Sequence, residues 1–234
     1  MTEDDIAVAL TEVARSLQNE RDEQGTLRAI TAAAVDTVPG TEYAGLMVVD
    51  HGRVDTRAAT DDVVREIDQA QFDTGEGPCL TALFDETTVR LTDMVDEHRW
   101  PNFAGRAVVL GIRSMLSFQL YVEDGTLGAL NLYAGDRDAF DDDAEHVGLL
   151  FAAHAAVALS GARQQEQCGR TIQIRDLIGQ AKGILMERYH LDAELAFGLL
   201  IQVSQRTGTR MIDVAAHLAR TGELRPVGPD AEGR

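Results

Sequence analysis

Hydrophobic residues recur at helical spacing near the start of the chain. Leu10, Val13 and Leu17 lie three and four residues apart within 5–20, and a similar pattern covers 24–38. Because residues three and four positions apart share one face of an α-helix, both segments are predicted to be amphipathic helices. Shorter helices are expected over 62–70, 79–84 and 101–110.

Strand signals dominate the middle of the chain. Tyr43–Val49 is a β-rich run, and residues of alternating character follow in Ser114–Val122 and Leu127–Ala134, as is typical of strands. The expected strands cover residues 43–49, 53–60, 88–91, 114–122 and 127–134. Asp50-His51-Gly52 and Asp124-Gly125 fall between adjacent strands and are typical hairpin turns. An α+β fold is therefore predicted, with helices flanking an antiparallel sheet of about five or six strands.

The segment after the last strand predicts a long exit helix and a change of domain. Acidic residues from Asp141 to Glu145 suit a helix N-terminus, and the helix is expected to run to about Gln167. Composition turns polar at 160–170, the candidate junction. Three further helices are expected over 171–190, 193–206 and 210–221. The buried face of the second should comprise Ala196, Phe197, Leu200 and Val203. The expected division is an N-terminal helix at 1–20, domains at 21–165 and 166–224, and a flexible tail at 225–234.

A heptad-like pattern runs along the exit helix and predicts a parallel homodimer. Its members are Val147, Leu150, His154, Val157 and Gly161, continued by Gln164 and Cys168. The apolar part spans only about two heptads. The alternative is therefore a helix that packs on its own sheet.

Composition restricts the class of protein. The chain has 234 residues, of which 44% are hydrophobic and 26% charged, as in a globular protein. The densest apolar run, Val147 to Leu159, is shorter than the roughly 20 residues of a membrane span. The acidic N-terminus is unlike a secretory signal, and two cysteines are too few for a disulfide framework or a four-cysteine zinc site. A cytoplasmic protein without a metal site or known cofactor is expected.

Charge is distributed unevenly along the chain. Residues 1–162 carry a net charge of −19 and residues 163–225 one of +2, within a total of −18. An acidic surface promotes solubility and is the simpler interpretation of the first part. If any part binds a polyanion, it is the C-terminal one. The only lysine in the chain, Lys182, lies there.

The first C-terminal helix carries a second stripe, about 100° from its predicted core face. The stripe comprises Arg175, Gly179, Lys182, Met186 and Tyr189. It combines cations that can contact phosphates with an aromatic ring on which a base can stack, as recognition of single-stranded RNA loops requires. A solvated face, or one covered by a partner helix, is the alternative interpretation.

The N-terminal part resembles a GAF domain over about residues 20–165. The resemblance rests on the order of its elements, on Leu127-Gly128-Ala129-Leu130-Asn131-Leu132-Tyr133, and on Ala139-Phe140-Asp141-Asp142-Asp143-Ala144-Glu145. It implies a sensor or dimerisation module that can bind a small molecule between its sheet and helices; the ligand is unknown.

Several specific sensor functions are disfavoured. Asp136-Arg137 replaces the Asn-Lys pair of cyclic-nucleotide-binding relatives. Cys79 follows a glycine-rich loop and could start a helix, a setting that lowers a thiol pKa, but a small buried residue is the simpler interpretation. His154 is expected in a core or dimer interface, not as a haem ligand. Some relatives reduce free methionine sulfoxide with paired cysteines, whereas Cys79 and Cys168 lie in different segments.

The C-terminal part resembles an ANTAR domain over about residues 165–222. The resemblance rests on Arg175-Asp176-Leu177-Ile178-Gly179-Gln180-Ala181-Lys182-Gly183-Ile184-Leu185-Met186-Glu187-Arg188, on Glu194-Leu195-Ala196-Phe197 and on Asp213-Val214-Ala215. These domains are RNA-binding output modules of bacterial antitermination regulators. The resemblance implies that a dimer binds paired RNA hairpins through their loops, so that the terminator cannot form. Lys182 is the motif lysine.

Other candidate RNA-binding residues follow from charge and position. Gly183 would allow close approach of the backbone, and Arg188, Arg206 and Arg210 add positive charge. We therefore predict a non-enzymatic GAF–ANTAR regulator that binds hairpins in nascent RNA. The alternatives are a signalling protein that acts by protein contact without RNA, and a GAF-type methionine sulfoxide reductase.

Overall fold

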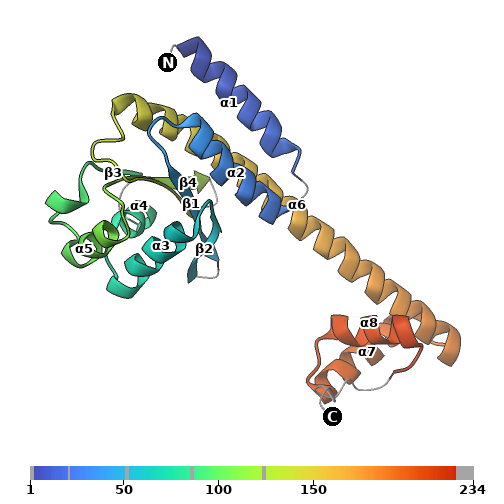
Figure 1. Ribbon diagram of the computed structural model, residues 1–234. Coiled ribbons are helices and arrows are strands. Elements are labelled where there is room, and N and C mark those ends of the chain that lie inside the picture. The colour runs from blue at the N-terminus through green and yellow to red at the C-terminus, as the bar shows by residue number, and fades with distance from the viewer. Residues whose placement is uncertain (1–2, 21, 51–52, 85–86, 123–124, 225–234) are drawn as a thin grey trace. The chain divides into compact units, whose positions relative to one another are not determined.

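The computed structural model describes residues 3–20, 22–50, 53–84, 87–122 and 125–224 (Figure 1). The expected turns Asp50-His51-Gly52 and Asp124-Gly125 lie partly outside these residues, and the expected tail at 225–234 lies wholly outside them. The chain forms two compact units, Met1–Gln165 and Glu166–Arg234. Each unit is described separately below.

The first unit is built on a five-stranded antiparallel sheet in the order β2-β1-β5-β4-β3. Its strands are β1 (Tyr43–Asp50), β2 (Arg53–Ala59), β3 (Thr88–Leu91), β4 (Ser114–Val122) and β5 (Gly125–Ala134). In the middle of the sheet, Leu130 of β5 pairs with Leu46 of β1 and with Phe118 of β4. This arrangement confirms the α+β fold and the five strands predicted from the sequence.

Helices cover both faces of this sheet (Figure 1). One face packs against α2 (Glu23–Thr37) and the first part of α6 (Asp142–Tyr189), with α1 (Glu3–Gln18) adding Leu10, Val13 and Leu17 to the same core. The other face packs against α3 (Asp62–Thr74), α4 (Pro78–Phe84) and α5 (Pro101–Val109). A short 3-10 helix, η1 (Met94–Asp96), is an element that the sequence pattern did not predict.

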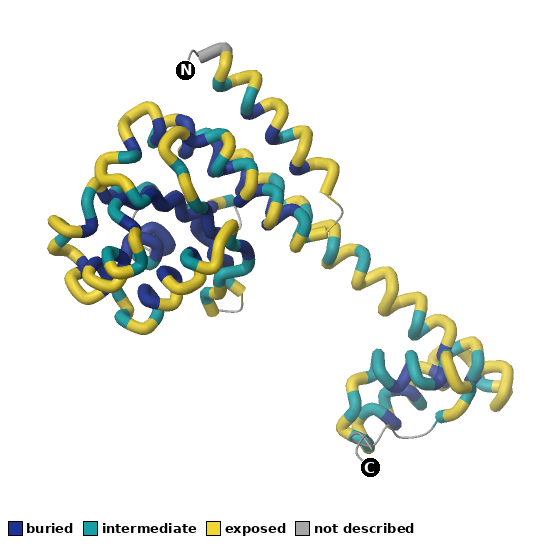
Figure 2. Tube along the Cα trace, viewed as in Figure 1, coloured by how far each residue is buried: buried dark blue, intermediate teal, exposed yellow. Residues whose placement is uncertain are grey.

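The helix α6 is continuous over 48 residues, so the expected break between residues 167 and 171 is wrong. Residues 160–170 contain no proline and are rich in Gln, Glu and Arg, which are good helix formers. Between Leu159 and Ala181 no residue of α6 is buried (Figure 2). The polar composition at the predicted junction therefore marks exposure to solvent and not the end of a helix.

By length and composition alone, the same helix is long and apolar enough to cross a membrane. One 18-residue window reaches a mean hydropathy of 1.2, and 44% of that window is buried in the structure. Residues such as Phe151, Ala155 and Leu159 pack in the core of the first unit. Burial against the sheet accounts for much of this apolar character, because a core helix needs the same residues.

The second unit is a small helical bundle. The end of α6 packs with α7 (Ala193–Thr207) and α8 (Met211–Thr221). Its core contains Ala181, Leu185, Ala196, Leu200, Val203, Val214, Ala215 and Leu218. The side chain of Asp192 accepts hydrogen bonds from the backbone of Glu194 and Leu195, which confirms it as the N-cap of α7.

Phe197 is the main departure from the expected core of this bundle. The sequence pattern placed it on the buried face of α7, but its exposed fraction is 36%. At about 100° per residue, Phe197 lies some 60° from Leu200 and 100° from Ala196, at the margin of the buried face. The core around Ala196 and Leu200 is completed without it.

Candidate functional site

The cationic stripe of α6, defined by Arg175, Gly179, Lys182, Met186 and Tyr189, lies on an accessible face of the second unit. All of these residues are exposed except Lys182, which is half-buried. Lys182 directly follows the buried Ala181, so it projects about 100° from the core face of the helix. Regular helical spacing thus aligns two cations, two apolar side chains and a glycine.

Lys182 is positioned beside an aromatic ring of the next helix. Its Nζ atom lies 5.9 Å from the centroid of the Phe197 ring, near the outer limit of a cation–π contact. This contact adds Phe197 to the face that carries the stripe. The sequence pattern missed this contact because helical periodicity alone assigned Phe197 to the core. The spacing between Lys182 and Phe197 in the sequence gave no sign that their side chains meet.

Two glycines of the candidate site border open space. A Cβ atom added at Gly179 or at Gly183 would meet nothing within 4 Å. Glycine within a helix costs about 0.5–1 kcal/mol relative to alanine. Internal packing therefore does not require either glycine, and each leaves the backbone open to close approach by another molecule.

The remaining candidate arginines lie apart from the stripe. Arg188 follows Lys182 by six positions, which places it about 120° away around α6, and its guanidinium donates to the carbonyl of Gly222 at the end of α8. Arg206 follows Phe197 by nine positions and so projects from the opposite side of α7. The Nε atom of Arg210 lies 2.7 Å from a carboxylate oxygen of Asp213 at the start of α8.

The first unit contains a buried polar cluster, centred on Asp68 of α3. The Tyr133 hydroxyl donates to one carboxylate oxygen of Asp68 at 2.5 Å, and the Thr56 hydroxyl donates to the other at 2.6 Å. Burial raises the pKa of Asp68 to about 6, although these two hydrogen bonds lower it. The cluster ties α3 to β2 and β5, and the sequence pattern gave no sign of it.

Cys79 lies in the same layer of the fold, in the first turn of α4. Its side chain is buried, its Sγ atom is 2.9 Å from the sulfur of Met47, and its backbone N–H donates to the side chain of Gln71. Burial and the nearby Asp68 raise the pKa of the thiol well above its usual value. This environment disfavours the reactive thiolate, in agreement with the simpler interpretation of Cys79 as a packing residue.

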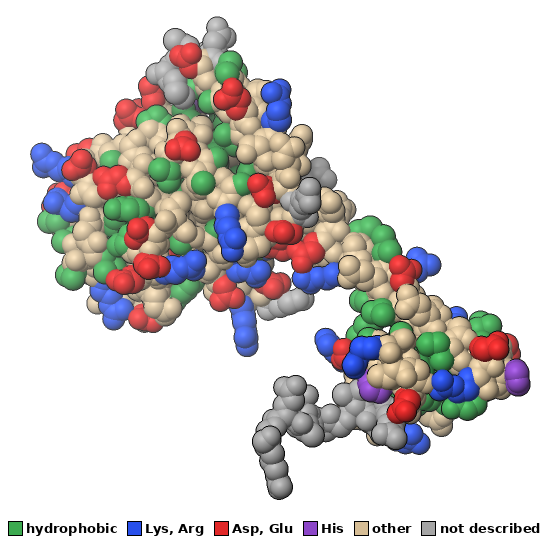
Figure 3. Space-filling model, turned by 45° about the vertical axis from the view of Figure 1, so that its right-hand side comes forward, with side chains coloured by type: hydrophobic (Ala, Val, Ile, Leu, Met, Phe, Trp, Pro, Cys, Tyr) green, Lys and Arg blue, Asp and Glu red, His purple; other side chains and the backbone are tan. Residues whose placement is uncertain are grey.

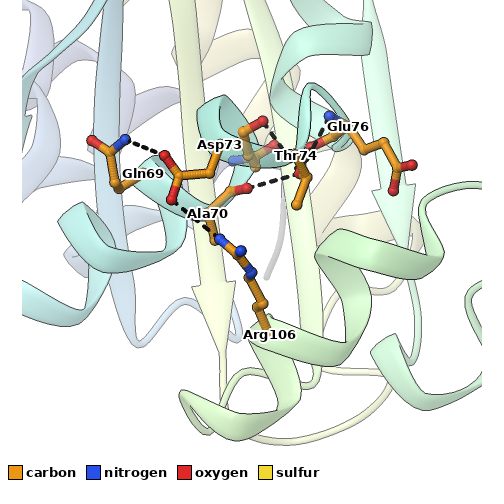
Figure 4. A network of polar contacts seen from close by, with 7 residues as sticks. Gln69, Ala70, Asp73, Thr74, Glu76 and Arg106 are labelled. Atoms are coloured by element: carbon orange, nitrogen blue, oxygen red, sulfur yellow. Dashed lines mark hydrogen bonds and ion pairs between the residues drawn. The ribbon is translucent and has the colours of Figure 1, made fainter.

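A groove of about 650 Å³ separates α3 from α5 on the surface of the first unit. The Nη1 atom of Arg106 lies 3.2 Å from Asp73, whose other carboxylate oxygen accepts from Gln69 (Figure 4). These contacts lower the pKa of Asp73, with the Gln69 hydrogen bond as the main cause. The ion pair between Arg106 and Asp73 joins α5 to α3 beside this groove, so it ties the two helices together.

The residues of the predicted dimer interface have different environments. Val147 is buried in the core of the first unit and Leu150 packs partly against it, whereas His154, Val157 and Gly161 are exposed. Two grooves of about 580 and 490 Å³ run between α1 and α6, and His154 lines both. Val157, with an exposed fraction of 70%, lines the larger one.

Acidic and basic side chains are interspersed on the visible face of the first unit, with hydrophobic side chains between them (Figure 3). Within the described residues, no group of three or more His, Cys, Asp or Glu side chains is placed to hold a metal ion. The best-defined candidate site is therefore the exposed face of the second unit that carries the cationic stripe and Phe197.

The sheet flanked by helices and the bundle with a cationic stripe form two separate domains. Family models match both parts: a GAF domain over residues 20–160 and an ANTAR domain over residues 166–218. The chain belongs to the GAF domain family and carries an ANTAR domain after its GAF domain. A comparison with curated proteins gives no match.

Solved structures share the fold of the first unit. The GAF domain of a phosphoenolpyruvate-protein phosphotransferase from Coxiella burnetii is 16% identical, with a TM-score of 0.55, over 69% of this chain and 96% of that one. The free methionine-R-sulfoxide reductase from Neisseria meningitidis is 16% identical, with a TM-score of 0.50, over 70% of this chain and 95% of that one. The Stigmatella aurantiaca phytochrome photosensory core module is 11% identical, with a TM-score of 0.59, over 86% of this chain but only 44% of that one. At these identities the likeness concerns the fold alone.

Proposed function

We propose that this chain is a bacterial transcription antitermination regulator of the cytoplasm that binds hairpins in nascent RNA. The observation that carries the proposal is the position of Lys182, the only lysine in the chain, on an exposed stripe of the ANTAR domain. An ammonium group on this face can contact a phosphate or a base of an RNA loop. Binding holds the transcript in a form that cannot fold the terminator, and polymerase continues.

The GAF domain is proposed to control this output as a sensor or dimerisation module. Its acidic character, −19 over residues 1–162, repels RNA and leaves the ANTAR face as the binding surface. The number of phosphate contacts is therefore small. For a dimer we expect log K to fall with log salt with a slope of about −2 to −4, and a slope near −10 would contradict this.

A homodimer is proposed because paired hairpins require two RNA-binding faces. The exposed apolar surface between α1 and α6, which includes Val157 and the grooves beside it, supports an interface at this position. Val147 is already buried within its own domain, so the interface would use the exposed members of the heptad pattern. Burial of their apolar side chains would stabilise the association.

Two alternative functions lead to different expectations. For a regulator that acts by protein contact alone, substitution of Lys182 would not change the RNA affinity. A methionine sulfoxide reductase needs a reactive cysteine, whereas burial raises the pKa of the Cys79 thiol. A turnover assay of the wild type and of Cys79→Ser tests the enzymatic alternative.

The proposal is tested by capture of cellular RNA, followed by sequencing, with the wild type, Lys182→Ala and Arg220→Ala. Arg220 is an exposed cation in the last turn of α8 that does not belong to the stripe, so its substitution is a control for charge. We expect the wild type and Arg220→Ala to enrich the same hairpins and Lys182→Ala to lose them. Equal enrichment by all three proteins would contradict a role for Lys182, and no enrichment by the wild type would contradict RNA binding.

A further inference from the structure

Phe197 presents part of an aromatic ring at the surface of α7. Its exposed fraction is 36%, and the Nζ atom of Lys182 lies 5.9 Å from the ring centroid. Phenylalanine is among the residues most often buried in folded proteins. The bundle core, formed around Ala196 and Leu200, is complete without this ring.

We propose that Phe197 stacks an unpaired base of the RNA loop while the ammonium of Lys182 contacts the adjacent phosphate. The inference rests on the proposed function and adds a residue that reads the base to one that contacts the backbone. A nucleotide presents a flat apolar base and a phosphate a few ångströms apart. The pair on α6 and α7 offers the two complementary groups, an aromatic face and a cation, at a comparable spacing.

The surroundings of the pair leave room for a nucleotide. Gly183 directly follows Lys182 and Gly198 directly follows Phe197, and a Cβ added at either glycine would meet nothing within 4 Å. Met186, one turn after Lys182, is also exposed and extends the apolar surface. Both helices are therefore open beside the residues that would bind the nucleotide.

The charges near the ring favour one orientation of the RNA. Glu194 is exposed one turn before Phe197 on α7, so its carboxylate repels phosphates from that end of the ring. Lys182, on the facing helix, attracts them. The base is accordingly placed on Phe197, with its phosphate toward α6. A protein partner that docks by apolar contact would not need this arrangement of charge.

The first experiment separates stacking from charge by the salt dependence of binding. Full-length wild type is used to select a stem-loop from a pool with randomised loops, and its affinity is measured between 50 and 200 mM salt as a typical range. Phe197→Leu should weaken binding about tenfold or more with an unchanged slope, because stacking releases no counterions. Lys182→Ala should make the slope shallower by about 0.7.

Leu195→Ala is the matched control. Leu195 has an exposed fraction of 59% and lies two residues before Phe197, on the other side of the core face of α7. Its substitution should leave both affinity and slope unchanged. The melting temperature of each variant verifies that the bundle remains folded.

The second experiment reports stacking directly. Phe197→Trp should bind the selected stem-loop with at least the affinity of the wild type, and the new indole should be quenched on binding. The wild type, whose only tryptophan is Trp100, provides the fluorescence background. A variant that binds RNA with no additional quenching would overturn the stacking role.

The outcomes of the salt experiment are also decisive. Wild-type affinity in Phe197→Leu would overturn the inference and leave the proposed function intact. A loss of affinity together with the shallower slope of Lys182→Ala would show that Phe197 only positions the lysine, which overturns base stacking. A wild type that selects no stem-loop contradicts the proposed function, and the inference falls with it. If Phe197→Leu binds RNA as the wild type does but no longer captures a protein that the wild type captures, the ring contacts a protein partner and the inference is wrong.

Discussion

The hydroxyl of Tyr133 on β5 donates a 2.5 Å hydrogen bond to the carboxyl group of Asp68, which is 1% exposed on α3. Burial raises the pKa of Asp68 from an ordinary value of 3.8 to about 6. The folded protein therefore binds this proton more tightly than the unfolded chain does. Between about pH 4 and pH 6 the contribution of Asp68 becomes less favourable to folding as pH rises, and above pH 6 it stays constant.

We predict that Asp68→Asn removes this component of the pH dependence. The difference in free energy of unfolding between variant and wild type should shift in favour of the variant by about 2 kcal/mol from pH 4 to pH 7. Urea unfolding at intervals of half a pH unit measures it. A difference that does not change with pH would show that Asp68 titrates normally in the folded protein.

The ion pair between Glu23 on α2 and Arg163 on α6 should stabilise the first unit. Its Nε–Oε1 distance is 3.1 Å, and both side chains are about four-fifths buried. Glu23→Gln leaves Arg163 without its counter-charge and should cost about 1–2 kcal/mol of unfolding free energy, after allowance for partial screening.

The control for that pair is Arg170 with Glu166, a more exposed pair one turn apart on α6. Glu166→Gln should cost about 0.5 kcal/mol or less, since exposed helical pairs contribute little. Denaturant unfolding of both variants makes the comparison, with the first unit followed by the fluorescence of Trp100 and the helices of the second unit, which contains Glu166 and Arg170, by circular dichroism. Equal losses would mean that burial does not strengthen the Glu23–Arg163 pair.

Alanine at Gly179 should improve stability while it impairs RNA binding. The added methyl group meets open space, so helix propensity predicts a gain of about 0.5–1 kcal/mol. If an RNA approaches the stripe closely, the same methyl group lowers affinity. Calorimetry and RNA titration of one protein sample test both effects. A gain in stability with full RNA affinity would remove Gly179 from the binding surface.

Charge at Val157 should disrupt the proposed homodimer. Val157 has an exposed fraction of 70% and lines a groove between α1 and α6, so Val157→Glu would place a charge within the interface. Leu149→Glu is the control, because Leu149 is exposed on α6 but is not part of the heptad pattern. Sedimentation equilibrium should give a monomer for the first variant and a dimer for the second. A dimer for both would move the interface elsewhere.

Much of this fold follows from local sequence patterns. Alternation located β4 at Ser114–Val122 as the structure has it, and Asp192 marked the start of α7, because a strand period and an N-cap are local signals. The continuity of α6 was missed because a polar stretch resembles a linker when its helix propensity is not weighed. The 3-10 helix Met94–Asp96 has too few residues to show a period.

The candidate site was only partly predictable. Helical spacing aligned Arg175, Lys182 and Tyr189, since all lie on one helix. The contact between Lys182 and Phe197 depends on how α7 packs against α6, and the hydrogen bond between Asp68 and Tyr133 joins residues 65 positions apart. Tertiary packing creates both, so no local pattern reveals them.

Read-through of a terminator in a purified transcription system tests the central claim most directly. The template carries a transcript captured by the wild type, and read-through is measured with no regulator, with the wild type and with Lys182→Ala. Our account predicts that the wild type increases full-length RNA and that Lys182→Ala does not. Termination that stays the same with and without the wild type, although the protein binds that transcript, would contradict it.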